Sequence, residues 1–275
     1  MLKQRIVTAL VLLGLLVGAL WLGRSAFVAV IALLFCGAVF EWLRLAGVPT
    51  ALCTVVAVVV VGCLVALEYF GRTPVGAVLT LVNAGAAAVW LTVLFVLVRA
   101  ERQPVRIGRA VSSMLALTLL PAAWLALLYL HRQGIVLMVS ALAIVWIADI
   151  AAYFTGRAFG KRKLAPRISP GKTWAGVWGA LAGVIAVAAL AQLLVPDAPL
   201  FSNGLFRQSW VLGGFVLCAL VAFSIVGDLF ESLLKRQAGA KDSGALLPGH
   251  GGILDRIDAL LPVLPLAVLL SRWVR

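Results

Sequence analysis

The chain contains a series of apolar runs, each about 18 residues or longer, separated by short polar segments. A helix of about 20 residues rises about 30 Å, which matches the hydrocarbon core of a bilayer. A helix is favoured there because it satisfies its backbone polar groups internally. The sequence therefore predicts an all-α, polytopic integral membrane helical bundle with about nine transmembrane helices. The expected spans cover residues 6–22, 25–40, 51–70, 75–98, 111–130, 135–154, 174–194, 210–230 and 253–273.

The composition agrees with a membrane protein, because 64% of the residues are hydrophobic and only 12% are charged. One integral membrane domain is expected over residues 1–275. Within it, residues 1–134 are expected to form an N-terminal group of spans, and residues 135–275 a C-terminal group with the longer polar loops. Two histidines, and four cysteines without a C-x-x-C pair, exclude a zinc site.

The positive charges are distributed unevenly between the two expected faces of the membrane. With nine spans, the N-terminus and the loops after spans two, four, six and eight carry most of the 23 Lys and Arg residues. The positive-inside rule predicts that this face is the cytoplasmic one. The expected location is the cell (inner or plasma) membrane. If the number of spans is odd, the C-terminus lies outside. The net charge of +13 does not indicate a nucleic-acid partner, because the chain has no soluble basic domain.

The segment 228–258 holds five of the ten acidic residues. If the eighth span continues as a helix, Asp228, Ser232 and Lys235 share one face, because they are spaced i, i+4 and i+7. Asp255 and Asp258 are spaced i and i+3 at the start of the last span. Three carboxylates from two helix ends predict a Mg²⁺ site formed by Asp228, Asp255 and Asp258, completed by substrate phosphates.

A glycine-rich turn from Pro248 to Gly252 lies in the same segment. Its backbone amides can approach a phosphate closely, and the turn leads into the positive end of the last helix. Four cations accompany it: Lys235, Arg236, Lys241 and Arg256. Cations for phosphate and carboxylates for metal predict phosphoryl or nucleotidyl transfer at the bilayer surface, where a lipid phosphate and a soluble nucleotide meet.

The loop after the sixth span carries six cations after Asp149 and no further anion. One interpretation is attraction to acidic lipid headgroups. The other is a phosphate site, in which Ser169, Lys172 and Thr173 add donors at the start of a helix. A Walker A loop is rejected, because Pro166 stands where that motif needs glycine and no preceding strand is expected. Asp149 lies within an apolar run, which predicts a role in the site, with pairing to a basic neighbour for packing as the alternative.

Two motifs carry a resemblance to the phosphatidate cytidylyltransferases, also called CDP-diacylglycerol synthases. The longer motif reads Ser232-x-x-Lys235-Arg236-x-x-x-x-Lys241-Asp242-x-x-x-x-x-Pro248-x-His250-Gly251-Gly252-x-x-Asp255-Arg256-x-Asp258. The Ala-Tyr and Ile-Ser-Pro-x-Lys-Thr-Trp elements of residues 149–174 are similar to a second region of that family. One departure is Ala175-Gly176, where the family often has Glu-Gly after Lys-Thr-Trp.

The resemblance implies that CTP and phosphatidate react to give CDP-diacylglycerol and pyrophosphate in phospholipid biosynthesis. It also implies a requirement for Mg²⁺, a monovalent cation such as K⁺ as an assisting ion in some members, a lipid bilayer environment and a homodimer. On this basis residues 1–134 are expected to serve packing or dimerisation, and residues 135–275 to supply the catalytic spans and cytoplasmic loops. By position, it implies catalytic roles for Asp228, Lys235, Arg236, Lys241, Asp242, His250, Asp255, Arg256 and Asp258. The implied substrate-binding residues are Ser169, Lys172, Thr173, Ser232, Gly251 and Gly252.

Two other functions remain as alternatives at this point. A CTP-dependent kinase acting on a polyprenol-type lipid would use similar groups, but it would need a base for a hydroxyl and would release CDP. A membrane anion transporter would explain the many spans and basic loops. It would also predict ionisable residues deep in several spans and repeated span pairs, whereas the charges here cluster on one face.

Overall fold

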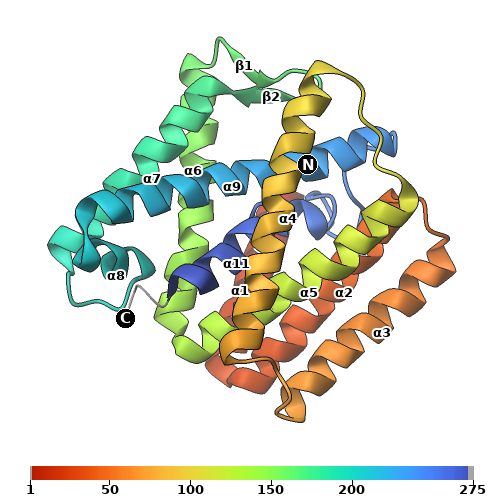
Figure 1. The fold of residues 1–275 in the computed structure, drawn as a ribbon, viewed down its shortest axis with the longest axis horizontal. Helices are drawn as coiled ribbons and strands as arrows, with labels where there is room; N and C mark the ends of the chain where they lie inside the picture. The colour runs from red at the N-terminus through yellow and green to blue at the C-terminus, as the bar shows by residue number, and fades with distance from the viewer. Residues whose placement is uncertain (1, 272–275) are drawn as a thin grey trace. The chain divides into compact units, whose positions relative to one another are not determined.

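The structure, a computed structural model, describes residues 2–271 and is mainly helical (Figure 1). The helices are α1 (Leu2–Leu22), α2 (Arg24–Leu45), α3 (Thr50–Tyr69), α4 (Gly76–Arg102), α5 (Arg109–Gln133), α6 (Ile135–Phe159), α7 (Trp174–Leu194), α8 (Phe201–Gln208), α9 (Trp210–Gln237), α10 (Leu254–Ile257) and α11 (Leu260–Leu270). Two short strands, β1 (Lys163–Ala165) and β2 (Ser169–Thr173), lie between α6 and α7.

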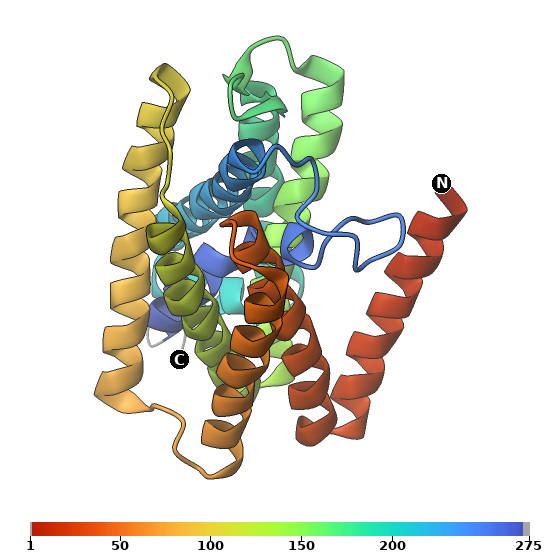
Figure 2. The same cartoon turned by 90° about the vertical axis from the view of Figure 1, so that its right-hand side faces the viewer.

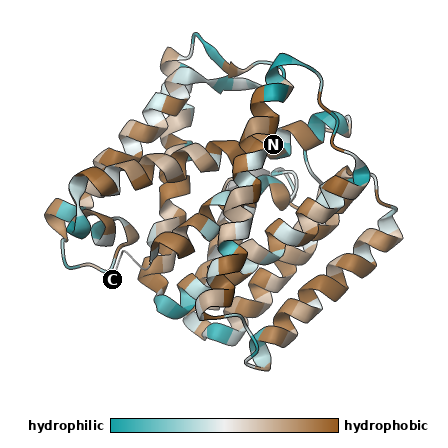
Figure 3. Ribbon diagram, viewed as in Figure 1, coloured by the Kyte–Doolittle hydropathy of each residue, from teal (hydrophilic) through white to brown (hydrophobic). Residues whose placement is uncertain are grey.

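Seven helices in the described part of the chain are long and apolar enough to cross a membrane. They are α2, α3, α4, α5, α6, α7 and α9. Figure 3 shows hydrophobic residues along these helices and hydrophilic residues at their ends and in the connections. The prediction of a polytopic helical membrane protein is confirmed, and seven of the nine expected spans correspond to these long apolar helices.

The two expected spans at the ends of the chain have different outcomes. The first, 6–22, lies within the single helix α1 (Leu2–Leu22). The last expected span, 253–273, is divided into the single turn α10 and the 11-residue α11. Eleven residues rise only about 17 Å, too little to cross the hydrocarbon core alone. Pro262 and Pro265 lack the backbone N–H that a longer regular helix would use. Trp273, the expected end of this span, lies outside the described residues.

The helices form two compact units that interleave along the sequence. The first contains the described residues up to Val75, together with Arg106–Leu125 and Leu234–Asp258. The second contains Gly76–Val105, Ala126–Leu233 and the described residues from Ala259 onward. Helices α5 and α9 each contribute to both units. The units do not coincide with residues 1–134 and 135–275, so the functional division at that boundary stays a prediction.

In the first unit, α2 packs against α1 and α3. Phe35 and Trp124 meet edge to face, with 5.4 Å between their ring centroids. The indole N–H of the buried Trp42 donates to Ser112 Oγ at 3.3 Å. Figure 2 shows the loop after α9 extending toward α1, where Thr8 Oγ1 donates to the carbonyl of Pro248 at 2.8 Å. This loop carries the glycine-rich turn, so the first unit fixes its position.

In the second unit, α6 and α7 pack closely along their lengths (Figure 1). Small residues allow this approach, since a Cβ added at Gly179 would overlap Thr155 and one at Gly183 would lie 2.7 Å from Ala151 Cβ. The two helices are joined by the antiparallel hairpin β1–β2, in which Lys163 pairs with Thr173 and Ala165 with Ser169.

The hairpin corrects the expectation that no strand precedes the Gly-Lys-Thr sequence. Lys172 and Thr173 end β2 and lead directly into α7. The rejection of a Walker A loop is unaffected, because that motif needs a glycine-rich loop between strand and helix.

A buried carboxylate near the ends of α2 and α3 leads to a prediction on stability. Arg24 Nε donates to Glu68 Oε1 at 3.0 Å, and Thr73 Oγ1 donates to Glu68 Oε2 at 3.0 Å. The Glu68 side chain is only 3% exposed. Replacing Arg24 by Gln leaves this carboxylate buried without its cation, which we expect to cost about 1–3 kcal/mol of stability. The measurement is thermal unfolding in detergent, followed by tryptophan fluorescence.

The matched control is Arg72→Gln, since Arg72 is an exposed arginine of the same unit. We expect its melting temperature to stay close to that of the unmodified protein. The double variant Arg24→Gln, Glu68→Gln should recover part of the loss, because it no longer buries an unpaired charge. Equal melting temperatures for the Arg24 and Arg72 variants would contradict the assigned role of the pair.

Candidate active site

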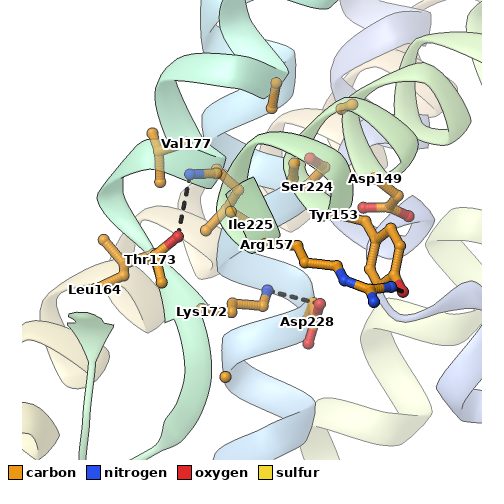
Figure 4. A pocket seen from close by; sticks show the side chains of 16 residues that line it. Asp149, Tyr153, Arg157, Leu164, Lys172, Thr173, Val177, Ser224, Ile225 and Asp228 are labelled. Atoms are coloured by element: carbon orange, nitrogen blue, oxygen red, sulfur yellow. Dashed lines mark hydrogen bonds and ion pairs between the residues drawn. The ribbon is translucent and has the colours of Figure 1, made fainter. Parts of the chain in front are cut away.

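A cavity of about 450 Å³ lies in the second unit, a size usual for small-molecule sites. It is formed by α6, the hairpin β1–β2, α7 and α9 (Figure 4). The polar and charged residues that line it are Asp149, Tyr153, Arg157, Lys172, Thr173, Ser224 and Asp228. We call this cavity the carboxylate pocket, because it contains two of the few acidic residues of the chain.

An ion pair lies in the carboxylate pocket. Lys172 Nζ is 2.6 Å from Asp228 Oδ2, and Figure 4 shows these side chains pointing toward each other from β2 and α9. Ser232, one turn further along α9, donates its hydroxyl to Asp228 Oδ1 at 3.4 Å. The helix α9 continues through Asp228 to Gln237, beyond the expected end of the span at residue 230, so the condition for a shared face of Asp228, Ser232 and Lys235 is met. Asp149, on α6, lines the same pocket. The structure thus brings Asp149 and Asp228 to one pocket, although the sequence analysis had assigned them to separate regions.

Thr173 has a structural role at the edge of the pocket. Its Oγ1 accepts a hydrogen bond from the backbone N–H of Gly176 at 3.2 Å, which caps the N-terminus of α7. Gly156 of α6 and Gly160, which directly follows this helix, approach it closely. A Cβ at Gly156 would lie 3.1 Å from Thr173 Oγ1, and one at Gly160 would lie 2.9 Å from the same atom. The hydroxyl that the sequence analysis assigned to substrate binding therefore holds the start of α7, next to Lys172.

The residues of the carboxylate pocket fit a Mg²⁺ ion. Mg²⁺ accepts one or two carboxylates and takes its remaining oxygen ligands from water and substrate phosphates. Asp149 and Asp228 offer such carboxylates. Lys172 adds a positive charge beside them, which favours a phosphate in the same cavity. The chemistry of this donor set is that of a site for a metal-bound phosphate.

A second cavity, of about 710 Å³, lies in the first unit. Its lining residues are Lys241, Asp242, Gly244, Ala245, Leu247, Pro248, Gly249, His250, Gly251 and Arg256. We call it the glycine-loop pocket. The turn at its centre is closed by backbone hydrogen bonds of 2.9 Å from Leu247 N to Gly251 O and from His250 N to Leu247 O. Gly249 and Gly251 have φ angles of 76° and 82°, which favour glycine over other residues.

Arg256 and Lys241 give the glycine-loop pocket positive charge. Arg256 Nη2 donates to the carbonyl of His250 at 2.5 Å, so this side chain lies across the turn. Both cations line the pocket together with exposed backbone. The arrangement suits an anionic ligand such as the phosphates of a nucleotide.

Asp255 is the centre of a hydrogen-bond network below this turn. Its Oδ1 accepts from Lys235 Nζ at 2.6 Å. Its Oδ2 accepts from the backbone N–H groups of Ser243 at 3.0 Å and Gly252 at 2.8 Å. Both side chains of the ion pair are largely buried, Lys235 at 14% exposure and Asp255 at 8%. Asp255, which the sequence analysis predicted as a metal ligand, thus organises the loop in the structure through these contacts.

The remaining predicted residues lie outside the lining of either pocket. Ser169 begins β2 and Arg236 is exposed near the end of α9. Asp258 is buried and follows α10. Residues 2–271 contain no cluster of three or more His, Cys, Asp and Glu side chains placed to hold a metal ion. The joint ligation of Mg²⁺ by Asp228, Asp255 and Asp258 therefore stays a prediction.

Sequence reasoning missed several residues that the structure brings to these sites. Tyr153, Arg157 and Ser224 line the carboxylate pocket. Arg157 Nη1 donates to Tyr153 Oη at 3.1 Å, one helical turn away. Glu41 and Ser243 bind the network around Asp255. Glu41 gave a usable signal, because it is an acidic residue directly after the apolar run 25–40, and an acidic residue so close to a span is unusual.

Comparisons with known proteins identify the family to which this chain belongs. The model of the cytidylyltransferase family matches residues 3–274. A phosphatidate cytidylyltransferase of Pseudomonas aeruginosa is 44% identical over 275 residues, covering 96% of this chain and 95% of that protein. The phosphatidate cytidylyltransferase of Haemophilus influenzae is 48% identical over 135 residues, 48% of this chain and 44% of that protein.

A third relative, the phosphatidate cytidylyltransferase of Staphylococcus aureus strain COL, is 44% identical over 136 residues, half of this chain and 49% of that protein. The family model and the Pseudomonas relative both extend over almost the whole chain, which confirms the resemblance seen in the two motifs. The chain belongs to the cytidylyltransferase family and is a nucleotidyltransferase.

Proposed function

We propose that this enzyme is a phosphatidate cytidylyltransferase. In the proposed reaction, a phosphate oxygen of phosphatidate attacks the α-phosphorus of CTP and forms a new P–O bond. The bond between the α-phosphorus and the bridging oxygen to the β-phosphate breaks, and pyrophosphate leaves with its electron pair. The products are CDP-diacylglycerol and pyrophosphate. Phosphatidate is already anionic near neutral pH, so the attacking oxygen does not require a strong general base.

The observation that carries the proposal is the Lys172–Asp228 pair beside Asp149 in the carboxylate pocket. Carboxylates next to a lysine in one cavity suit a metal-bound phosphate, and this chain belongs to the cytidylyltransferase family. The exposed apolar side chains of Ile150 and Phe154 on α6 are compatible with a lipid whose phosphate enters the pocket. The curated relatives carry the name of this activity.

In this proposal Asp149 and Asp228 hold Mg²⁺ in the carboxylate pocket, and Asp255 and Asp258 remain further candidate ligands. Mg²⁺ supplies charge neutralisation for the phosphates and the leaving pyrophosphate. Lys172 exchanges its contact with Asp228 for a substrate phosphate and orients it. A charge-assisted hydrogen bond from lysine to phosphate is stronger than a neutral one, which favours this exchange.

The glycine-loop pocket is proposed to bind phosphates of CTP. Lys241 and Arg256 supply the charge, and the backbone of Gly251 approaches without a side chain. His250 lines the pocket and is proposed to donate a hydrogen bond to the same anion. Lys235 is held by Asp255 at 2.6 Å, which fits a role in keeping the loop in shape.

The proposed location of both pockets is the cytoplasmic face of the cell membrane. The excess of Lys and Arg in the loops on the side of the chain's N-terminus supports this orientation. CTP then reaches the site from the cytoplasm, and phosphatidate from the bilayer. The family resemblance also favours a homodimer.

The proposal is tested with purified protein in detergent, phosphatidate, CTP and Mg²⁺, by measuring pyrophosphate and lipid products. We expect equal amounts of pyrophosphate and CDP-diacylglycerol, both abolished by EDTA. Release of CDP with phosphorylation of a polyprenol would instead establish the kinase alternative. An active protein that forms neither product, but moves an anion across sealed vesicles, would establish the transporter alternative.

The carboxylates give a prediction about turnover. Asp228→Asn removes a metal-binding charge in the carboxylate pocket. Asp255→Asn places an amide where a carboxylate accepts from Lys235, Ser243 and Gly252. We expect each change to lower kcat by about a hundredfold or more. The measurement is the initial rate of pyrophosphate release at saturating CTP. Asp197→Asn, an exposed aspartate between α7 and α8, is the matched control and should keep normal turnover. Normal rates for Asp228→Asn would rule out its metal role.

Lys172 gives a separate prediction about substrate binding. Replacing it by Gln removes the ammonium group that lies 2.6 Å from Asp228 Oδ2. We expect kcat/KM to fall by about tenfold to a hundredfold, because a charge-assisted contact to phosphate is lost. Rates are measured while CTP and phosphatidate are varied separately, to show which substrate loses the contact. Lys161→Gln, at an exposed position before β1, is the control and should retain its kcat/KM. Equal values for both variants would show that Lys172 does not contact a substrate phosphate.

A further inference from the structure

Glu41 is a buried carboxylate of the first unit that the proposed chemistry does not use. It lies near the C-terminal end of α2 and is only 1% exposed. Burying a charged group is unfavourable unless hydrogen bonds or opposite charges compensate for the lost water. Its contacts therefore indicate what this carboxylate does.

All the hydrogen bonds that Glu41 accepts in the described structure come from the glycine-loop segment. Oε2 accepts from the hydroxyl of Ser243 at 2.9 Å and from the backbone N–H of Leu254 at 2.8 Å. These two donors lie at either end of the segment that contains the turn, more than 200 residues from Glu41 in sequence. One carboxylate oxygen thus ties both ends of the loop to a long helix.

Two glycines of the same segment fit against the Glu41 carboxylate. A Cβ added at Gly244 would overlap Oε1, and a Cβ added at Gly252 would overlap Oε2. Oε1 is buried and has no hydrogen-bond partner among the described residues. The loop backbone therefore packs directly on this carboxylate, which leaves no room for water between them.

Ser243 connects Glu41 with Asp255. Its Oγ lies 2.9 Å from Glu41 Oε2 and 3.0 Å from Asp255 Oδ2, and it accepts from the backbone N–H of Asp255 at 3.3 Å. Asp255 in turn binds Lys235 at 2.6 Å. The result is a buried chain from α2 through Ser243 and Asp255 to the cation on α9.

We propose that Glu41 is a positioning residue, which holds the glycine loop and the Asp255 carboxylate in place for nucleotidyl transfer through Ser243 and Leu254. It touches no reacting group itself. The proposal rests on the proposed function for its effect on catalysis. The role of Glu41 in holding the loop rests only on the hydrogen bonds and the packing described above, and it holds whatever reaction the enzyme catalyses.

The loop itself is tested by amide hydrogen exchange of the detergent-solubilised protein without CTP, lipid or Mg²⁺. In Glu41→Ala the N–H of Leu254 loses its acceptor, and Ser243 loses one of its carboxylate partners. We expect exchange in residues 243–255 to accelerate by about tenfold to a hundredfold, with the ends of α2 and α3 around Arg24 and Glu68 unchanged. Unchanged exchange in the loop, or equal acceleration throughout the first unit, would overturn the positioning role.

The matched control is Glu68→Gln, another buried carboxylate of the first unit. Its partner Arg24 lies about 25 Å from Glu41 along α2, at 1.5 Å per residue. This variant should alter thermal stability and leave exchange in the loop normal. Loop exchange that rises as much as in Glu41→Ala would show that general destabilisation explains the effect.

Conservative and coupled variants complete the test. Glu41→Gln keeps one carbonyl oxygen as acceptor for Ser243 and Leu254, so it should recover most of the protection that Glu41→Ala loses. Ser243→Ala should increase loop exchange, and adding it to Glu41→Ala should cause little further increase, because both act in one chain. A glutamine variant no better than alanine, or fully additive effects, would overturn the proposed connection.

The kinetic readout uses CTP, phosphatidate and Mg²⁺ in the same detergent. We expect kcat of Glu41→Ala to fall about tenfold to a hundredfold, and KM for CTP to change less, because the loop is still present but misplaced. A normal kcat with a loosened loop would overturn the catalytic part of the inference. If the unmodified enzyme forms no CDP-diacylglycerol, the proposed function fails, while the exchange data still decide the role of Glu41 in the loop.

Discussion

The cost of leaving a charged or polar group unpaired in apolar surroundings controls the arrangement of this protein. Most of the chain avoids that cost by forming apolar helices, whose backbone groups pair within each helix. Three of the acidic residues in or near the helices have a specific basic partner. Glu68 binds Arg24, Asp228 binds Lys172, and Asp255 binds Lys235. Each of these contacts ties together elements that are distant in sequence, so the few charges define where helices and loops meet.

The two pockets use this constraint in different ways. In the carboxylate pocket, the Lys172–Asp228 pair is partly exposed, so a phosphate or a metal ion can compete for either partner. In the network below the glycine loop, Lys235 and Asp255 are more buried, and the carboxylate also accepts backbone N–H groups. The first arrangement suits exchange with a ligand. The second suits a fixed support, on which the exposed turn with its two positive-φ glycines is built.

The helices of the membrane part were predictable from sequence, because the length and hydropathy of each run are local properties. The motif from Ser232 to Asp258 was recognisable for the same reason, since its spacing is visible in one segment. The division between α10 and α11 was harder to foresee, because overall hydropathy conceals the effect of Pro262 and Pro265 on backbone hydrogen bonding. The Lys172–Asp228 pair and the anchoring of Ser243 by Glu41 depend on contacts between distant segments, which periodicity cannot reveal.

The close packing of Gly244 and Gly252 on the Glu41 carboxylate also affects how this enzyme can change during evolution. None of the three positions is independent, because a side chain at either glycine needs space that the glutamate occupies. A shorter residue at position 41 would provide that space at Gly244, whereas a side chain at Gly252 would still overlap Ser243 Oγ. The shorter residue would also remove the acceptor for Ser243 and Leu254. Single substitutions therefore meet either a steric or a polar barrier, and only combined substitutions avoid both. Position 41 of α2 is thus sterically and chemically coupled to the loop, although α2 contributes no residue to either pocket.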